Sequence, residues 1–176
     1  ILTLDGVQVS ADNVLGDPTK GADIVEWIQQ RAVAGLCAMQ AGVCEKALRL
    51  TAAHVSEREQ FGVKIATFQA VAQRAAEAFI DTEAISLTAR QAAWCLAADA
   101  PAAAALATAK FWAAEAGQRV VHAAQHLHGG IGVDTDYPVH RYFRWAKQLE
   151  LTLGGTTTHL RRLGAQLAAE PVQAGV

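Results

Sequence analysis

The sequence contains little charge of either sign and no long uninterrupted apolar run. Charged residues make up only 18% of its 176 residues, and 15 lysines and arginines against 17 acidic residues give a formal net charge of -2. Without a basic excess the chain cannot neutralise a phosphate backbone, which disfavours nucleic-acid binding. Charged residues or glutamines interrupt each apolar run well before the roughly 18 residues that a membrane-spanning helix needs. The sequence therefore predicts neither a nucleic-acid partner nor a membrane span.

Cysteine is scarce, and a secretion signal is missing. The 3 cysteines, Cys37, Cys44 and Cys95, are odd in number, widely spaced and set in helix-like sequence. This pattern disfavours a disulfide framework or a zinc site. The N-terminal residues show neither a basic region nor a cleavage-type segment, so nothing indicates export. We therefore expect buried thiols and a cytoplasmic location.

Apolar residues are abundant, and their pattern changes early in the chain. Hydrophobic residues make up 52% of the sequence, which is enough to bury a sizeable core and excludes global disorder. Residues 1–10 alternate apolar and polar side chains, as a β-strand does, and a turn-rich connector follows. A lone strand cannot satisfy its own edges. We therefore expect residues 1–20 to be the tail of a middle β-domain and its connector.

From residue 21 to residue 170 the sequence is rich in good helix formers. The predicted helices are residues 23–56, with Asp23 as N-cap and Glu26 completing a capping box; residues 67–98; Pro101 to about residue 127; one from near Pro138; and one from near Thr156. Long helices joined by short loops fold back on one another. The prediction is an all-α, antiparallel up-and-down four-helix bundle with a fifth C-terminal helix, followed by a tail at residues 171–176.

The first break in the helical pattern runs from Arg58 to Gly62 and is followed by Phe68 and Gln69. An arginine beside an aromatic residue and a glycine can form an anion site with a stacking face. The same residues can instead end a helix, with Gly62 as C-cap and Phe61 in the core. Composition alone favours the second interpretation.

The second break, residues 125–133, has glycine at positions 129, 130 and 132. Such a loop lets backbone N–H groups approach a ligand closely and can hold a pyrophosphate. His126 and His128 lie in this stretch and His122 just before it, and His122 and His126 have the i,i+4 spacing of some metal ligands. Because no carboxylate completes a site nearby, no metal site is predicted.

The third break contains Gly154 and Gly155, followed by Thr156, Thr158 and His159. Two glycines before a threonine are typical of a helix end followed by an N-cap. The N-terminus of the next helix can also face an anion, with the hydroxyl groups as additional donors.

Together these stretches resemble the C-terminal helical domain of the acyl-CoA dehydrogenase family. The family shows R-x-x-F-G followed by F-Q, then Q-x-x-G-G-x-G, then P-x-x-R-x-x-R-x-A, and a G-T pair that opens the last helix. The residues that carry the resemblance are Arg58, Phe61, Gly62, Phe68, Gln69, Gln125, Gly129, Gly130, Gly132, Pro138, Arg141, Arg144, Ala146, Gly155 and Thr156. Residues 7–16 resemble the family's exit from its middle β-domain, so the similarity covers nearly the whole chain.

The resemblance implies that the chain helps to hold FAD across a subunit interface in an enzyme that dehydrogenates acyl-CoA thioesters. Arg58 would face the diphosphate of a neighbouring subunit's FAD, with Phe61 beside the flavin or adenine portion. The other implied contacts are Phe68, Gln69, Gln125, Gly129 and Gly130 on the adenine side, and Thr156 and Thr158 on the chain's own FAD. A guanidinium fork and bare backbone amides are the donors that a diphosphate needs.

The sequence departs from the family at the catalytic base. The commonest base is a glutamate immediately before the G-T pair, where this sequence has Gly154. Some relatives instead carry a glutamate on the first long helix, at the position of Ala32, and the nearest acidic residue, Glu26, would point elsewhere around that helix. Glu150 is an unsupported substitute. No catalytic residue is therefore assigned.

Two explanations fit this departure. The resemblance implies a homo- or hetero-oligomer, a dimer of dimers. In the favoured explanation the oligomer is mixed, and a homologous partner subunit supplies the base while this chain supplies FAD contacts. The H-G-G-I-G and L-E-L-x-L-G-G-T segments resemble the paired acyl-CoA dehydrogenases of actinobacterial steroid side-chain breakdown. Alternatively, the base lies at an unrecognised position, or the chain is a non-catalytic structural or binding subunit of the same fold. A ferritin-like di-iron bundle is excluded, because no glutamate is followed three residues later by histidine.

Overall fold

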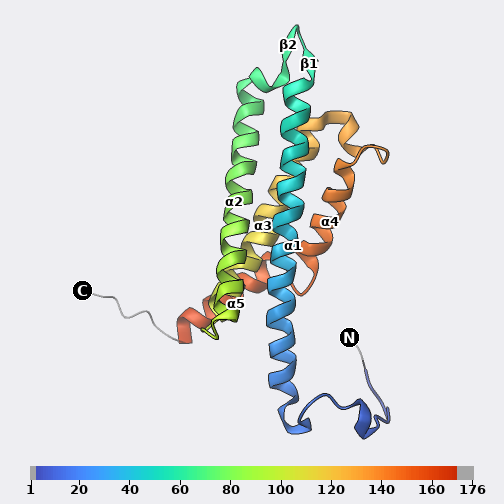
Figure 1. Cartoon of the computed structure of the whole chain (residues 1–176), viewed down its shortest axis with the longest axis vertical. Helices are drawn as coiled ribbons and strands as arrows, with labels where there is room; N and C mark the ends of the chain where they lie inside the picture. Colours follow the sequence, from blue (N-terminus) through green and yellow to red (C-terminus); the bar gives the residue numbers. More distant parts are fainter. Residues whose placement is uncertain (1–2, 170–176) are drawn as a thin grey trace, which may run out of the picture.

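The computed structural model describes residues 3–169, most of which lie in five α-helices (Figure 1). The helices are α1 (Gly21–Glu57), α2 (Gln69–Ala97), α3 (Ala103–His128), α4 (Val139–Leu151) and α5 (Thr156–Ala169). This confirms the all-α prediction, and each helix begins within a few residues of its expected start. The predicted tail at residues 171–176 lies outside the described residues.

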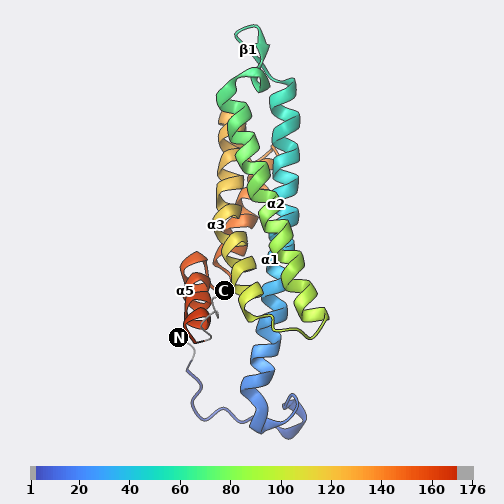
Figure 2. The same cartoon turned by 90° about the vertical axis from the view of Figure 1, so that its left-hand side faces the viewer.

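Three long helices form the body of the bundle. Helices α1, α2 and α3 lie side by side along its long axis, and α4 packs against α1 and α3 (Figures 1 and 2). Helix α5 packs against α3 in the lower half of both views. No helix among residues 3–169 has the length and apolar character needed to cross a membrane.

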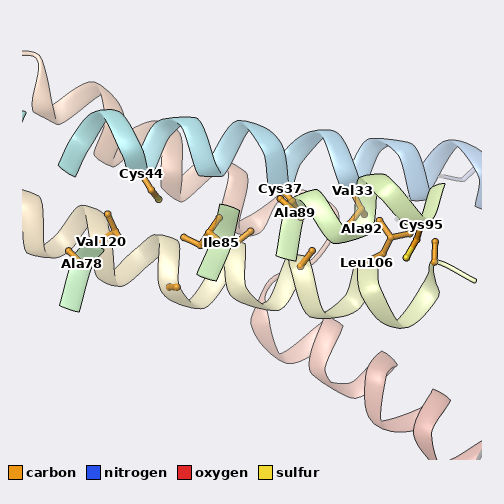
Figure 3. Close-up of a cluster of buried hydrophobic side chains, with 14 of the residues drawn as sticks. Val33, Cys37, Cys44, Ala78, Ile85, Ala89, Ala92, Cys95, Leu106 and Val120 are labelled. Carbon is orange, nitrogen blue, oxygen red and sulfur yellow. The ribbon is translucent and has the colours of Figure 1, made fainter. Parts of the chain in front are cut away.

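Small side chains let the long helices approach closely. The core between α1, α2 and α3 combines a few larger apolar side chains, such as Val33, Ile85 and Val120, with buried alanines (Figure 3). Alanine adds little bulk and is the best helix former. A second cluster, which includes Val43, Val121 and residues of α4, joins α4 to α1 and α3.

The three cysteines are buried and free, as the sequence analysis predicts. Burial raises the pKa of Cys37 and of Cys44 to about 12. Both thiols therefore stay protonated at neutral pH and behave as small apolar side chains.

The N-terminal segment differs from the prediction in two ways. Residues 3–10 form no strand, although their pattern alternates, because no other strand lies beside them in the described part of the chain. Helix α1 begins at Gly21, so Asp23 lies inside its first turn rather than at the N-cap. The reason lies upstream, where the Asp17 carboxylate accepts a 2.9 Å hydrogen bond from the Thr19 N–H and caps a short 3₁₀ turn that leads directly into the helix.

A β-hairpin that the sequence analysis did not predict connects α1 and α2. Strands β1 (Glu59–Gln60) and β2 (Val63–Lys64) pair antiparallel, and the loop residues Phe61 and Gly62 have φ of 54° and 79°. Positive φ at both central residues is the pattern of a type I′ turn. The interpretation of Gly62 as a helix C-cap with Phe61 in the core is therefore wrong: α1 ends at Glu57, and Phe61 is 93% exposed.

Candidate functional site

The first two of the three sequence stretches lie at the same end of the bundle. The rings of His54, in the last turns of α1, and His128, the last residue of α3, stack with their centroids 4.5 Å apart. His54 lies four residues before Arg58, and His128 directly precedes Gly129. The stacked rings therefore bring the start of the hairpin next to the start of the glycine-rich loop, at the top of the bundle in Figure 1.

The hairpin presents a cation and aromatic rings to solvent. Arg58 is exposed and takes part in no ion pair among residues 3–169. Phe61 meets Phe68 edge to face, with centroids 6.3 Å apart. Lys64 holds the hairpin on the helix end, because its Nζ donates to the Glu57 carbonyl at 3.1 Å and pairs with Glu59 at 2.7 Å.

The backbone of the glycine-rich loop requires glycine at position 129 and has free space beside it at position 130. Gly129 has φ 63° and ψ −141°, a combination of backbone angles that residues other than glycine rarely adopt. A Cβ added to Gly130 would meet no atom within 4 Å, so a ligand can approach the backbone there. Both residues are exposed.

The glutamine positions divide between the two stretches. Gln69 is the exposed first residue of α2, next to Phe68 and the hairpin. Gln125 is half-buried on α3, four residues before Gly129. The family pattern Q-x-x-G-G places its glutamine three residues before the first glycine, which in this chain is the exposed His126. The spacing therefore departs from the family at this point, and Gln125 is the weaker of the two glutamine assignments.

The histidines beside the glycine-rich loop point in different directions. His128 is buried, and its Nδ1 lies 2.7 Å from the Ala124 carbonyl oxygen. The ring of His122 instead packs edge to face on Phe143, with centroids 4.9 Å apart. Within residues 3–169 no group of three or more histidine, cysteine or acidic side chains is placed to hold a metal ion.

The third stretch lies apart from the other two. Helix α4 leads away from the glycine-rich loop over about 20 Å at 1.5 Å per residue, and the α4–α5 turn, residues 152–155, follows it. Within this turn Leu153 and Gly154 have φ of 58° and 101°. Thr156 is half-buried at the start of α5, and Thr158 is exposed two residues further on. These threonines therefore do not join the residues at the hairpin end.

The two acidic groups considered as bases each interact with a side chain of their own helix. The Glu150 carboxylate pairs with Lys147 at 2.7 Å. Glu26 accepts a 3.2 Å hydrogen bond from Gln30 and lines an open groove of about 570 Å³ between α1, α3 and α5. Ala32 is exposed on α1.

Sequence reasoning missed Lys110. This side chain is 1% exposed, and its Nζ donates to the carbonyl oxygens of Leu149, Glu150 and Gly154 at 3.0, 2.9 and 3.0 Å. The sequence did contain a signal for a buried cation: Lys110 is the one lysine of α3 and lies among alanines on its otherwise apolar face.

Acid is expected to weaken the fold through His54 and His159. Burial lowers the pKa of both imidazoles, and the nearby His128 lowers that of His54 further. Each group therefore binds a proton more readily in the unfolded chain, where its pKa is about 6.5. The stability that the neutral rings contribute is complete above this pH and is lost as the pH falls below it. We expect the free energy of unfolding, measured with urea, to decrease from pH 7 to pH 5.

The His54→Phe variant tests this expectation, because phenylalanine keeps a ring against His128 and cannot titrate. Its free energy of unfolding should vary less steeply between pH 7 and pH 5. His126→Phe, at an exposed position near the end of α3, serves as the control. Equal pH slopes in the two variants would contradict the assignment to His54.

Comparison with known proteins assigns this architecture to a family. The family described as "Acyl-CoA dehydrogenase, C-terminal domain" matches residues 19–168. Acyl-CoA dehydrogenase FadE27 of Mycobacterium tuberculosis is 47% identical over 97% of this chain and 47% of its own length. FadE28 of the same organism is 37% identical over 94% of this chain and 48% of its own length. The chain thus spans about half the length of these curated relatives.

Solved structures agree with this result. The crystal structure of the ChsE4-ChsE5 complex from Mycobacterium tuberculosis includes a chain that is 49% identical, with a TM-score of 0.89 over 96% of this chain and 45% of that one. Butyryl-CoA dehydrogenase from Megasphaera elsdenii is 29% identical, with a TM-score of 0.86 over 91% of this chain and 42% of that one. The chain belongs to the acyl-CoA dehydrogenase family, which confirms the resemblance stated from its motifs.

Proposed function

We propose that this chain is part of an FAD-dependent acyl-CoA dehydrogenase and supplies part of an FAD site at a subunit interface. The enzyme would remove the α-proton of an acyl-CoA thioester with a base. FAD, when bound, would accept the hydride from the β-carbon. We place the enzyme in the cytoplasm. Residues 1–20 would be the tail of its middle β-domain, which would explain why Leu4, Val7 and Val9 are exposed in the chain alone.

The separation of the two groups of proposed contacts carries this proposal. Arg58 and Phe61 are exposed at the hairpin end. Thr156 instead opens α5 beyond the far end of α4, a helix about 20 Å long at 1.5 Å per residue. Groups separated in this way can serve two cofactors, one belonging to a neighbouring subunit and one to the chain itself. Such an arrangement requires an oligomer, and we propose a dimer of dimers.

The residues at the hairpin end fit the chemistry of a dinucleotide. An exposed guanidinium at Arg58 can bind a diphosphate bidentately. The exposed ring of Phe61 can pack beside a flavin or adenine ring. The open backbone at Gly130 lets a ligand approach. We propose that Phe68, Gln69, Gln125 and Gly129 complete the adenine side, and that Thr156 and Thr158 contact the chain's own FAD.

We propose that a homologous partner subunit supplies the catalytic base. Gly154 offers no acidic group, and its φ of 101° disfavours any other residue there. Two of the similar structures are of two-component proteins by name, the ChsE4-ChsE5 complex and the Tcur3481-Tcur3483 steroid ACAD G363A variant. The latter is 49% identical, with a TM-score of 0.78 over 81% of this chain and 40% of that one. Both names support a hetero-oligomer, and the description of the second as a steroid ACAD supports a steroid-derived acyl-CoA as the substrate. The alternative is a non-catalytic partner subunit, which the conformation of Gly154 favours for the chain alone.

Native mass spectrometry of the full-length protein, purified with any co-eluting chain, tests the proposal. We expect bound FAD and a second, homologous subunit that carries the glutamate. Dehydrogenation of an acyl-CoA by this complex would support the enzyme, and a flavin-containing complex without activity would favour the non-catalytic alternative. A complex without flavin would overturn the proposed FAD site.

Arg58→Ala is expected to weaken FAD retention at least about tenfold, because a hydrogen bond to a charged group contributes about 1.5–3 kcal/mol. The dissociation constant of FAD, measured by flavin fluorescence, provides the readout. Arg49→Ala removes the same charge from an exposed position of α1, where the only ion pair of the arginine among residues 3–169 is with Glu45. Equal FAD affinity in the two variants would count against the role of Arg58.

A further inference from the structure

Lys110 is a fully buried lysine with three backbone acceptors. It is the largest side chain among those with less than 2% exposure. An ammonium group has three N–H donors, and the three carbonyl oxygens of Leu149, Glu150 and Gly154 lie within 3.0 Å of its Nζ. Burial lowers the pKa of Lys110, and the three carbonyl oxygens oppose this effect because they favour the charged form. The number of acceptors matches the protonated side chain.

The three acceptors belong to the end of α4 and to the turn after it. The carbonyls of Leu149 and Glu150 are in the last turn of α4, where helix carbonyls lack intrahelical partners and carry the negative end of the helix dipole. The Gly154 carbonyl belongs to the α4–α5 turn. The Lys110 ammonium group on α3 thus contacts backbone that lies between 39 and 44 positions further along the sequence.

A second buried side chain holds the same turn from α5. The Nε2 atom of His159, a residue that is 2% exposed, lies 3.1 Å from the Leu153 carbonyl oxygen. Leu153 has φ 58°, in the left-handed region that side-chain-bearing residues seldom adopt. Such a conformation persists only where the surroundings determine it. Lys110 and His159 provide these surroundings.

We propose that Lys110 is a positioning residue for the α4–α5 turn. Its ammonium group fixes the backbone at Gly154, the place of the base in most of the family, and the point at which Thr156 opens α5. Without it, one buried and two partly buried carbonyl oxygens would lose their donor, and the turn would rearrange to reach water. The consequence for the cofactor, that Lys110 orients Thr156 toward the chain's own FAD, rests on the proposed function.

Hydrogen exchange of the full-length protein tests the structural part. Two amides report on the turn, because Thr152 N–H bonds to the Gln148 carbonyl at 3.0 Å and Gly154 N–H to the Leu151 carbonyl at 3.3 Å. Lys110→Met keeps a long apolar side chain and removes the donors, and exchange at residues 149–158 should accelerate at least about tenfold.

Gln40→Met is the matched control. Gln40 is a polar residue of α1 that is also 1% exposed, and its side-chain amide contacts Cys44 rather than the turn. This variant should leave exchange at residues 149–158 unchanged even if its melting temperature falls equally. The same exchange rate in both variants would overturn the proposal. If Lys110→Met does not fold, Lys110→Arg, which places the cation at a different reach, should show a smaller acceleration of about threefold, and no acceleration would overturn the proposal.

The dissociation constant of FAD and the visible flavin spectrum test the part that concerns the cofactor. In the intact complex, Lys110→Met should bind FAD about tenfold more weakly and with a shifted spectrum, whereas Gln40→Met should match the wild type. Unchanged affinity and spectrum in a Lys110→Met protein with a loosened turn would overturn the link to FAD. A wild-type complex without flavin would instead overturn the proposed function, and the exchange result would stand by itself.

Discussion

Gly154→Glu, which introduces the family's most common base residue, is expected to destabilise the protein and to produce no dehydrogenase activity. Gly154 has φ 101°, and a Cβ there would lie 2.9 Å from Thr158 Cγ2 and 3.1 Å from Thr158 Cβ. Backbone strain of this kind costs about 1–3 kcal/mol, and overpacking adds a similar amount. We therefore expect the free energy of unfolding to fall by about 3 kcal/mol. Urea unfolding and an assay with an acyl-CoA and an artificial electron acceptor measure the two effects.

Two further glycine variants separate strain from the glutamate charge. Gly154→Ala should retain most of the loss, because both the strained φ and the close contact involve the Cβ atom. Gly164→Ala serves as the control, since Gly164 lies in α5 and a Cβ there would meet nothing within 4 Å. It should raise the free energy of unfolding by about 0.5–1 kcal/mol, because alanine is the better helix former. A Gly154→Glu protein that is active and as stable as the wild type would contradict the strained geometry of the α4–α5 turn.

Ile85→Ala is expected to have the largest effect on stability among core substitutions. Ile85 is 0% exposed and lies between the three long helices (Figure 3). Removal of its side-chain atoms leaves a cavity that rigid neighbouring helices fill only in part. Isoleucine-to-alanine changes at such sites cost about 2–5 kcal/mol, and we expect about 3–4 kcal/mol in urea unfolding.

Leu87→Ala is the matched control on the same helix. Leu87 is 69% exposed, so its truncation should change the free energy of unfolding of the chain alone by no more than about 0.5 kcal/mol. A loss at Ile85 no larger than that at Leu87 would contradict the arrangement of α2 in the core. A large loss at Leu87 only in the intact complex would place this side of α2 in a subunit interface.

The helices and the family could be predicted from local sequence. Alanine-rich segments, a proline ahead of α3 and the glycine pairs that separate α3, α4 and α5 each act within a few residues, so their effect does not depend on the rest of the fold. The motifs that identify the family are also short and keep their order along the chain. The one exception in spacing, at Gln125, can be checked in the sequence itself.

The burial of Phe61 could not be decided from composition. An aromatic residue before a glycine fits a helix cap with a buried ring, and it also fits the tip of a hairpin. The structure favours the hairpin because Gln60 pairs with Val63 and Lys64 ties the base of the hairpin to α1. The predicted start of α1 was wrong for a related reason. Asp17 and Asp23 are both good capping residues, and only the observed hydrogen bond from Thr19 to Asp17 distinguishes them.

Residue types and near-neighbour spacing are enough to specify the helical bundle, its approximate boundaries, its family and the lack of an acidic group at position 154. Three features emerge only from the folded chain: which stretches meet at one end of the bundle, that residues 3–10 have no strand beside them within residues 3–169, and that Lys110 holds the α4–α5 turn. The partners in these interactions are far apart in the chain, as Lys110 and Gly154 are by 44 positions. Their contact depends on how the helices pack, which local side-chain preferences do not specify.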